Sequence, residues 1–188
     1  MSVLPVTMIG DKILRKKVEK VEDIDNDAIE LIADMWETMK NANGVGLAAN
    51  QVGADKKIFI VDLSDMEKYE DTKPTVFINP EIVEYSDETS VIDEGCLSIP
   101  DIRANVERPK KITIRYFDTD MNEKVIDADE LMARVIQHEY DHLLGVLFTD
   151  LVDDETKKKL KKPLQNIKKR KIEVSYPISE NIDYQLAG

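Results

Sequence analysis

Both histidines of the chain lie in the hexapeptide QHEYDH, at positions 137–142. This is the pattern H-E-x-x-H, and on a helix it puts His138 and His142 on one face, one turn apart, where they can share a metal ion. Glu139, beside the first histidine, can reach a water bound to that ion. Leu131 and Val135 continue the same face toward the N-terminus, so the metal would lie on the inward side of the helix. One histidine on an apolar stripe is more often a hydrogen-bonded core residue, but a pair with an acid between them favours a metal site.

A catalytic metal of this kind usually has three protein ligands and one open position, so a third ligand is needed. The longer pattern H-E-x-x-H-x-x-G-x-x-H would supply a histidine. Gly145 fits it, but its last position is Phe148 and the chain has no third histidine. Other metallopeptidases use a downstream glutamate, whereas the downstream acids here lie in polar stretches without a helical pattern (Asp150, Asp153, Asp154, Glu155, Glu173 and Glu180). The single cysteine, Cys96, is the remaining soft candidate. It is either a small buried hydrophobic residue or, with the paired histidines, the thiolate of a Cys-His-His set.

The histidine pattern falls in a predicted helix at residues 128–144. Asp127, with Glu130 three residues later, is typical of a capping box, and Gly145 suits the position just past the helix end. A small-residue loop, GVGLAANQVG at 44–53, lies far upstream. It lacks the Lys and Ser/Thr of a phosphate-binding loop and follows a helix rather than a strand, which excludes that interpretation.

The other elements indicate one mixed domain. An amphipathic helix is predicted at 27–41, opened by Asp27 and Glu30 as a capping box, with an apolar stripe that includes Ile29. Short apolar or alternating runs predict strands at 57–63, 75–79, 112–117, 123–126 and 146–149. The expected fold class is therefore α+β, with small β-sheets packed around a central metal-binding helix that carries HExxH.

Composition limits the class of protein further. The chain has 188 residues, a net charge of −12 and one cysteine, which fits a globular protein without an internal disulfide and favours a reducing, cytoplasmic location. It contains no run of 18 apolar residues and no signal-peptide pattern at its start. The acidic balance argues against nucleic-acid binding over the whole surface. We expect a catalytic domain at 1–152 and a C-terminal basic helix and tail at 153–188.

The basic charge is concentrated near the C-terminus. From Lys157 to Lys171 there are nine Lys or Arg residues and no acid, against 17 basic and 38 acidic residues in the rest of the chain. Pro163 is expected to interrupt any helix in this stretch, and residues 173–188 are expected to be a weakly structured tail. The stretch is either a solvated helix face or a docking site for ribosomal RNA.

Three motifs in order resemble the bacterial-type peptide deformylase family: GVGLAANQ at 44–51, EGCLS at 94–98 and QHEYDH at 137–142. The spacing between them is also similar, and the resemblance covers residues 6–152. It implies removal of the formyl group from the N-terminal formyl-methionine of new polypeptides. It further implies a characteristic Fe(II) cofactor that Zn, Ni or Co can replace.

Carried over residue by residue, the resemblance makes Cys96, His138 and His142 the metal ligands and Glu139 the proton shuttle. It makes the Gln51 side chain and the backbone N–H of Leu97 the donors to the developing oxyanion. Gly46 would let the loop backbone approach the substrate closely. The methionine pocket would be lined by four residues (Val45, Arg103, Leu131 and Val135).

Two rival functions remain open from the sequence. One is a metallopeptidase that cleaves ordinary peptide bonds through the same helix, which would need a His or Glu as third ligand. The other is a non-catalytic module with a structural metal, but such sites are closed sets of four ligands and the chain has only three soft ones.

Overall fold

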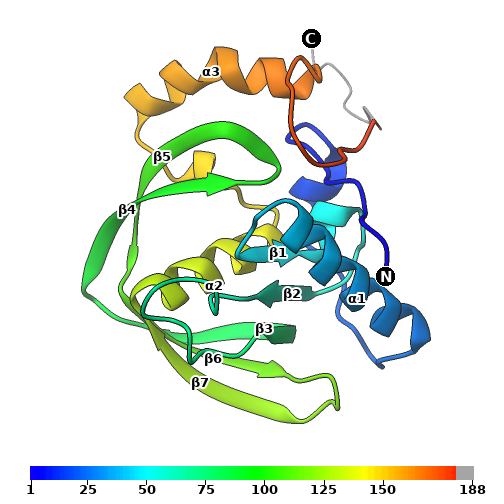
Figure 1. Cartoon of the computed structure of the whole chain (residues 1–188). Helices are drawn as coiled ribbons and strands as arrows, with labels where there is room; N and C mark the ends of the chain where they lie inside the picture. Colours follow the sequence, from blue (N-terminus) through cyan, green and yellow to red (C-terminus); the bar gives the residue numbers. More distant parts are fainter. Residues whose placement is uncertain (181–188) are drawn as a thin grey trace.

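A central helix, α2 (Glu130–Leu143), lies between two antiparallel sheets (Figure 1). In this computed structural model, which describes residues 1–180, the larger sheet has the strand order β1-β2-β3-β6-β7 and the smaller one pairs β4 with β5. The strands are β1 (Gly46–Ala48), β2 (Ile58–Val61), β3 (Thr75–Tyr85), β4 (Thr89–Cys96), β5 (Ile99–Pro109), β6 (Lys111–Phe117) and β7 (Glu123–Asp129). The predicted mixture of helix and sheet around one helix is confirmed.

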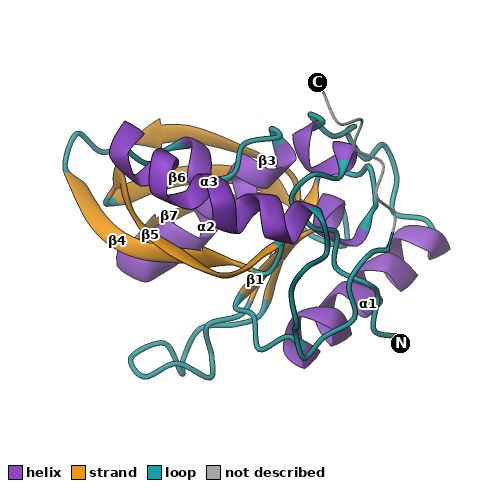
Figure 2. Ribbon diagram, turned by 90° about the horizontal axis from the view of Figure 1, so that it is seen from above, coloured by secondary structure: helices purple, strands orange, loops and turns teal. Residues whose placement is uncertain are grey.

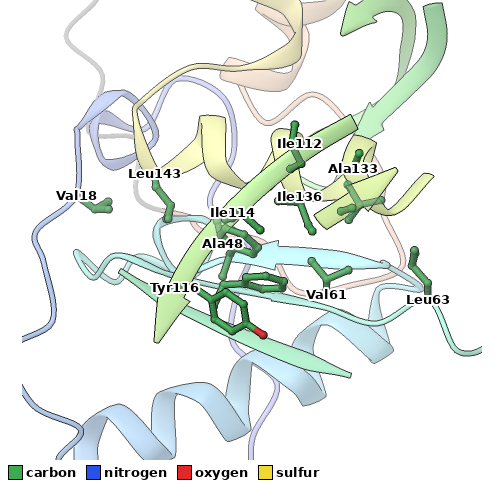
Figure 3. Packing of buried hydrophobic residues seen from close by; sticks show 14 residues of the cluster. Val18, Ala48, Val61, Leu63, Ile112, Ile114, Tyr116, Ala133, Ile136 and Leu143 are labelled. Atoms are coloured by element: carbon green, nitrogen blue, oxygen red, sulfur yellow. The ribbon is translucent and has the colours of Figure 1, made fainter. Parts of the chain in front are cut away.

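At its β1–β2 end the larger sheet is covered on both faces, and the sequence of β2 explains why. All four residues of β2 are buried, and successive side chains of a strand point to opposite faces. Phe59 and Val61 join the core that α2 covers, in which Figure 3 labels Val61, whereas Ile58 and Ile60 pack toward helix α1 (Asn26–Asn41). A continuous apolar run is what a strand buried on both faces requires.

Helix α1 occupies the predicted place but begins differently. Its N-cap is Asp25, whose side chain accepts a hydrogen bond of 2.8 Å from the backbone N–H of Ala28, so the capping box expected at Asp27 is wrong. Ile29 is 55% exposed and does not belong to the buried stripe of α1. The predicted start of the next helix, with a capping box at Asp127, is wrong as well, because α2 begins at Glu130. Asp127 is still in β7, where its carboxylate accepts a hydrogen bond from the Thr113 hydroxyl.

The β4–β5 hairpin forms the other side of the molecule. A separate apolar cluster lies beneath it and includes Val106, Phe148 and Ile167. Helix α3 (Asp154–Lys168) lies over this hairpin, as Figure 2 shows from above. The segment at 146–149 is not a strand, because the Asp150 side chain accepts from the Leu147 backbone N–H and closes a short 3₁₀ helix, η3 (Phe148–Asp150).

Helix α3 runs through Pro163, so the expected interruption is wrong. The proline is exposed, which leaves the unpaired carbonyl one turn earlier open to water. Leu160, Leu164 and Ile167 pack into the cluster under the hairpin on both sides of the proline. Their burial stabilises the helix against the lost hydrogen bond.

From the end of α3 to Glu180 the chain has little regular secondary structure, as expected, but it is attached to the rest of the protein. Residues 173–180 return to the body of the molecule, where Val6 bridges to Ile178 and the Val6 N–H donates to the Pro177 carbonyl. The remainder of the expected tail, 181–188, lies outside the described residues. Across residues 1–180, no helix is both long and apolar enough to span a membrane.

Candidate metal centre

Three soft ligand atoms meet beside α2. His138 and His142 come from one face of that helix, and Cys96 ends strand β4. Their ligand atoms all lie within 4.8 Å of one another, and Cys96 Sγ is 3.2 Å from His142 Nε2. Two atoms that each bond one ion at about 2.0–2.3 Å lie no more than about 4.6 Å apart, so this set fits a metal ion with little adjustment. The buried Nδ1 atom of His142 has no hydrogen-bond partner among the described residues.

A buried carboxylate orients His138. Glu94 Oε2 lies 2.9 Å from His138 Nδ1, which leaves Nε2 to face the other two ligand atoms. The same carboxylate accepts hydrogen bonds from two buried guanidinium groups, at 2.7 Å from Arg108 and 2.8 Å from Arg134. Arg108 also bonds Asp141 on α2 at 2.6 Å. The network links the β4–β5 hairpin to α2 and fixes the imidazole between them.

Glu139 is buried in a different electrostatic setting. It is 4% exposed, and its Oε2 atom makes no hydrogen bond to any described residue. Burial raises the pKa of Glu139 to about 7, against the opposing effect of His138. In contrast, the hydrogen bonds from His138 and Arg108 outweigh burial and hold the pKa of Glu94 far below its usual value. Two neighbouring carboxylates thus differ in their ease of protonation, which is the pattern of a proton-transfer site.

The loop at 44–53 contains β1 and a short 3₁₀ helix, η2 (Ala49–Val52). A Cβ at Gly46 would lie only 2.5 Å from Glu139 Oε1, so a glycine is required for the loop to approach this carboxylate. Gln51 is buried, and its Oε1 accepts from the Ala48 backbone N–H at 2.8 Å. This bond turns the Gln51 amide N–H₂ group toward Cys96 Sγ, at 3.5 Å, and Ser98 Oγ, at 3.2 Å.

A cleft of about 730 Å³ opens onto these groups. Cys96, His138, Glu139, Gln51, Gly46 and Leu97 all line it, and so do the four residues expected in the methionine pocket, Val45, Arg103, Leu131 and Val135. The Arg103 guanidinium is largely exposed and bonds Asp93 at 2.5 Å, so its charge is paired at the cleft edge. Apart from His142, which does not line this cleft, the predicted site residues, spread from Val45 to Glu139 in the sequence, are therefore brought to one cavity.

Several residues at the centre were not found from the sequence. Asn50 donates to the His142 carbonyl at the end of α2, and Arg108 and Arg134 hold Glu94. These polar side chains stand in strands and helices where nothing local marks them as buried. Tyr176 was missed as well, because it lies in the expected tail, yet its hydroxyl donates to the Leu97 carbonyl at 2.7 Å.

Comparison with known proteins finds one family. The sequence pattern of the polypeptide deformylases matches residues 3–158. The peptide deformylase of Prosthecochloris aestuarii is 43% identical, covering 95% of each chain, and that of Cytophaga hutchinsonii is 47% identical, covering 93% of this chain and 95% of the other. The crystal structure of peptide deformylase from Ehrlichia chaffeensis in complex with actinonin superposes with a TM-score of 0.82. It is 38% identical and covers 92% of this chain and all of that one.

Proposed function

The chain belongs to the polypeptide deformylase family and is a hydrolase that removes the formyl group from N-formylmethionyl polypeptides; we propose that Cys96, His138 and His142 hold its metal ion and that Glu139 moves the proton. The observation that carries these roles is the meeting of the three soft ligands beside a cleft that Cys96, His138 and Glu139 line, where the buried Oε2 of Glu139 has no hydrogen-bond partner among the described residues. Family membership gives no support to the alternative of cleaving ordinary peptide bonds.

The ion is proposed to be Fe(II), with Zn, Ni or Co able to take its place. A thiolate with two imidazoles suits any of these borderline metals, so the donor set alone does not choose among them. When bound, the ion supplies Lewis acidity, which lowers the pKa of water and polarises a carbonyl oxygen. A thiolate ligand is open to oxidation, which agrees with a reducing, cytoplasmic location.

Glu139 is proposed to carry one proton from water to the leaving amine. Its carboxylate accepts the proton as the water oxygen bonds to the formyl carbon, and then donates it to the amide nitrogen as the C–N bond breaks. Formate and the free methionine amine are the products. Burial raises the pKa of Glu139, which suits this carboxyl group to hold the proton between the two halves of the transfer.

Gln51 and the Leu97 backbone N–H are proposed to stabilise the negative charge that builds on the formyl oxygen. Gln51 is already oriented by Ala48, so it loses little freedom in the reaction. An amide also donates without titrating, which keeps this help independent of pH. The methionine side chain would lie against Val45, Leu131 and Val135, because an unbranched thioether fits an apolar slot.

The test is release of formate from formyl-Met-Ala by protein purified without oxygen, with metal content measured on the same sample. We expect turnover with close to one ion per chain. Cys96→Ala should lose both metal and activity, whereas Glu139→Gln should keep the metal and lose activity. Full metal content in Cys96→Ala would contradict the ligand assignment.

Helix α3 is proposed to dock on ribosomal RNA and place the enzyme near its substrate. Lys157, Lys158, Lys161 and Lys168 line a shallow cavity together with Arg15 and Asp150, which pair with each other, so the four lysines give this face its positive charge. We expect co-sedimentation with ribosomes that weakens steeply with salt. Reversal of charge at Lys157, Lys158 and Lys161 should abolish it without changing formate release, and unchanged co-sedimentation would end the proposal.

A further inference from the structure

The segment after α3 is fastened to the protein body as a strap, residues 170–179. Figure 1 shows it in red, returning from the end of α3 past the N-terminal segment. Arg170 bonds the buried Asp11 at 2.7 Å, and the Ser179 backbone N–H donates to the Val6 carbonyl at 2.9 Å. Val6 in turn donates to Pro177 at 2.9 Å. The position of the strap is therefore fixed at both of its ends.

Between these attachments the strap reaches the cleft. Four of its consecutive residues, 173–176, line the same cavity as Glu139 and Cys96. Tyr176 packs its ring into the apolar cluster under the β4–β5 hairpin. Its hydroxyl donates a hydrogen bond of 2.7 Å to the Leu97 carbonyl, across 79 positions of sequence.

Leu97 belongs to a two-residue turn that carries several proposed functional groups. The turn joins Cys96 to Ile99, which pair across the hairpin. Cys96 contributes the thiolate, Leu97 the backbone N–H, and Ser98 the hydroxyl that accepts from Gln51. The Ser98 carbonyl is held by the Ile9 backbone N–H at 2.9 Å, and the Leu97 carbonyl is held by Tyr176. These two bonds hold the carbonyl groups of Leu97 and Ser98, and so fix the peptide groups that join Leu97 to Ser98 and Ser98 to Ile99.

We propose that Tyr176 is a positioning residue for deformylation: its hydroxyl fixes the Leu97–Ser98 turn and so aims the Leu97 N–H at the formyl oxygen. The inference rests on the proposed oxyanion role of Leu97. A donor that is held in place before reaction stabilises a transition state without reorganisation, whereas a turn free to rotate does not. The strap thus makes the C-terminal segment part of the catalytic apparatus.

The experiment compares Tyr176→Phe with the wild type on formyl-Met-Ala and on the longer formyl-Met-Ala-Ser. The variant keeps the ring and its packing and removes only the hydroxyl. We expect kcat to fall about 5- to 10-fold on both peptides, the size expected for one lost hydrogen bond, with KM and metal content unchanged. Tyr85→Phe is the control, because Tyr85 is half exposed on β3 and does not line the cleft.

Each other outcome overturns the proposal in a recognisable way. A rise in KM limited to the longer peptide would make Tyr176 a substrate contact. Loss of metal would mean that it acts through the thiolate. A lower melting temperature with unchanged kcat would make its role structural only. Gln51→Leu tests the other proposed donor to the formyl oxygen: kcat lost there but kept in Tyr176→Phe refutes the role of Tyr176 alone, whereas kcat kept in both refutes the role of Gln51 as well.

Discussion

Helices α2 and α3 are both amphipathic and both carry many charges, but the charges on α2 form buried contacts whereas those on α3 are exposed. On α2, Arg134 and His138 meet Glu94 in a network whose carboxylate is 5% exposed. On α3, Lys159 and Glu155 form an ion pair of 2.7 Å in which both side chains are at least 70% exposed. Water screens the second pair and is excluded from the first. Charges on α2 therefore orient the His138 imidazole and hold the core together, whereas those on α3 act through the field they create at the surface.

Glu139→Gln tests the α2 side of this comparison most strongly. Removal of the proposed proton carrier should lower kcat by about 10²- to 10⁴-fold. Stability should be unchanged or slightly higher, because the buried Oε2 of Glu139 accepts no hydrogen bond from the part of the chain that the structure describes. Steady-state formate release and thermal unfolding are the measurements. Glu155→Gln on α3 is the matched control and should change neither, so a comparable loss of kcat in both variants would refute the distinction.

Among the charged residues of the α2 network and of α3, Glu94 should be the one whose substitution, Glu94→Gln, destabilises the protein most. Within residues 1–180, it leaves Arg134 without an anionic partner and removes one of the two that Arg108 has. Breaking a buried pair by removing one charge costs about 3–5 kcal/mol of unfolding free energy. Urea unfolding of metal-free protein measures this cost. If Glu94→Gln changed the free energy of unfolding as little as Glu155→Gln, the network around Glu94 would have to be solvated.

Gly46→Ala tests how closely the loop must approach α2. The added methyl group would lie 2.5 Å from Glu139 Oε1 and force this carboxylate to move. A displacement near 1 Å can cost about 10²-fold in rate, so kcat should fall by that order. Gly53→Ala is the control, since no atom of residues 1–180 lies within 4 Å of a Cβ added there, although the φ of Gly53 is +81°. It should lose about 1–2 kcal/mol of stability and keep its kcat. If Gly46→Ala kept its kcat and Gly53→Ala lost it, the close approach of the loop to Glu139 would not matter for the reaction.

The exposed pair on α3 should give the smallest effect. A double-mutant cycle on Glu155 and Lys159 is expected to show a coupling energy of about 0.3–0.5 kcal/mol. The coupling should decrease as salt is raised, because the charges are exposed. Thermal or urea unfolding of the four proteins in the cycle provides the value. A coupling above about 2 kcal/mol would show that this surface behaves like the buried network.

The sequence predicted those parts of the centre that depend on local spacing. His138 and His142 share a face because four residues make one helical turn, and this holds wherever the helix lies. Gly145 was expected just past the helix end, and it follows the C-cap Leu144 with φ +77°. The local expectations failed where a distant contact intervened, as at Asp127, which Thr113 holds in β7. Pro163 stays inside α3 because apolar burial on both sides outweighs one missing bond.

The amino-acid sequence by itself determined the number and kind of soft ligands, the helix that presents two of them and the family to which the chain belongs. Only the tertiary structure decided which buried groups surround them. Glu94 owes its low pKa to Arg108 and His138, which approach it from another strand and from α2. Tyr176 reaches the turn at Leu97 only because the chain folds back past Val6. Burial and long-range pairing depend on the whole chain at once, so no local pattern of residues encodes them.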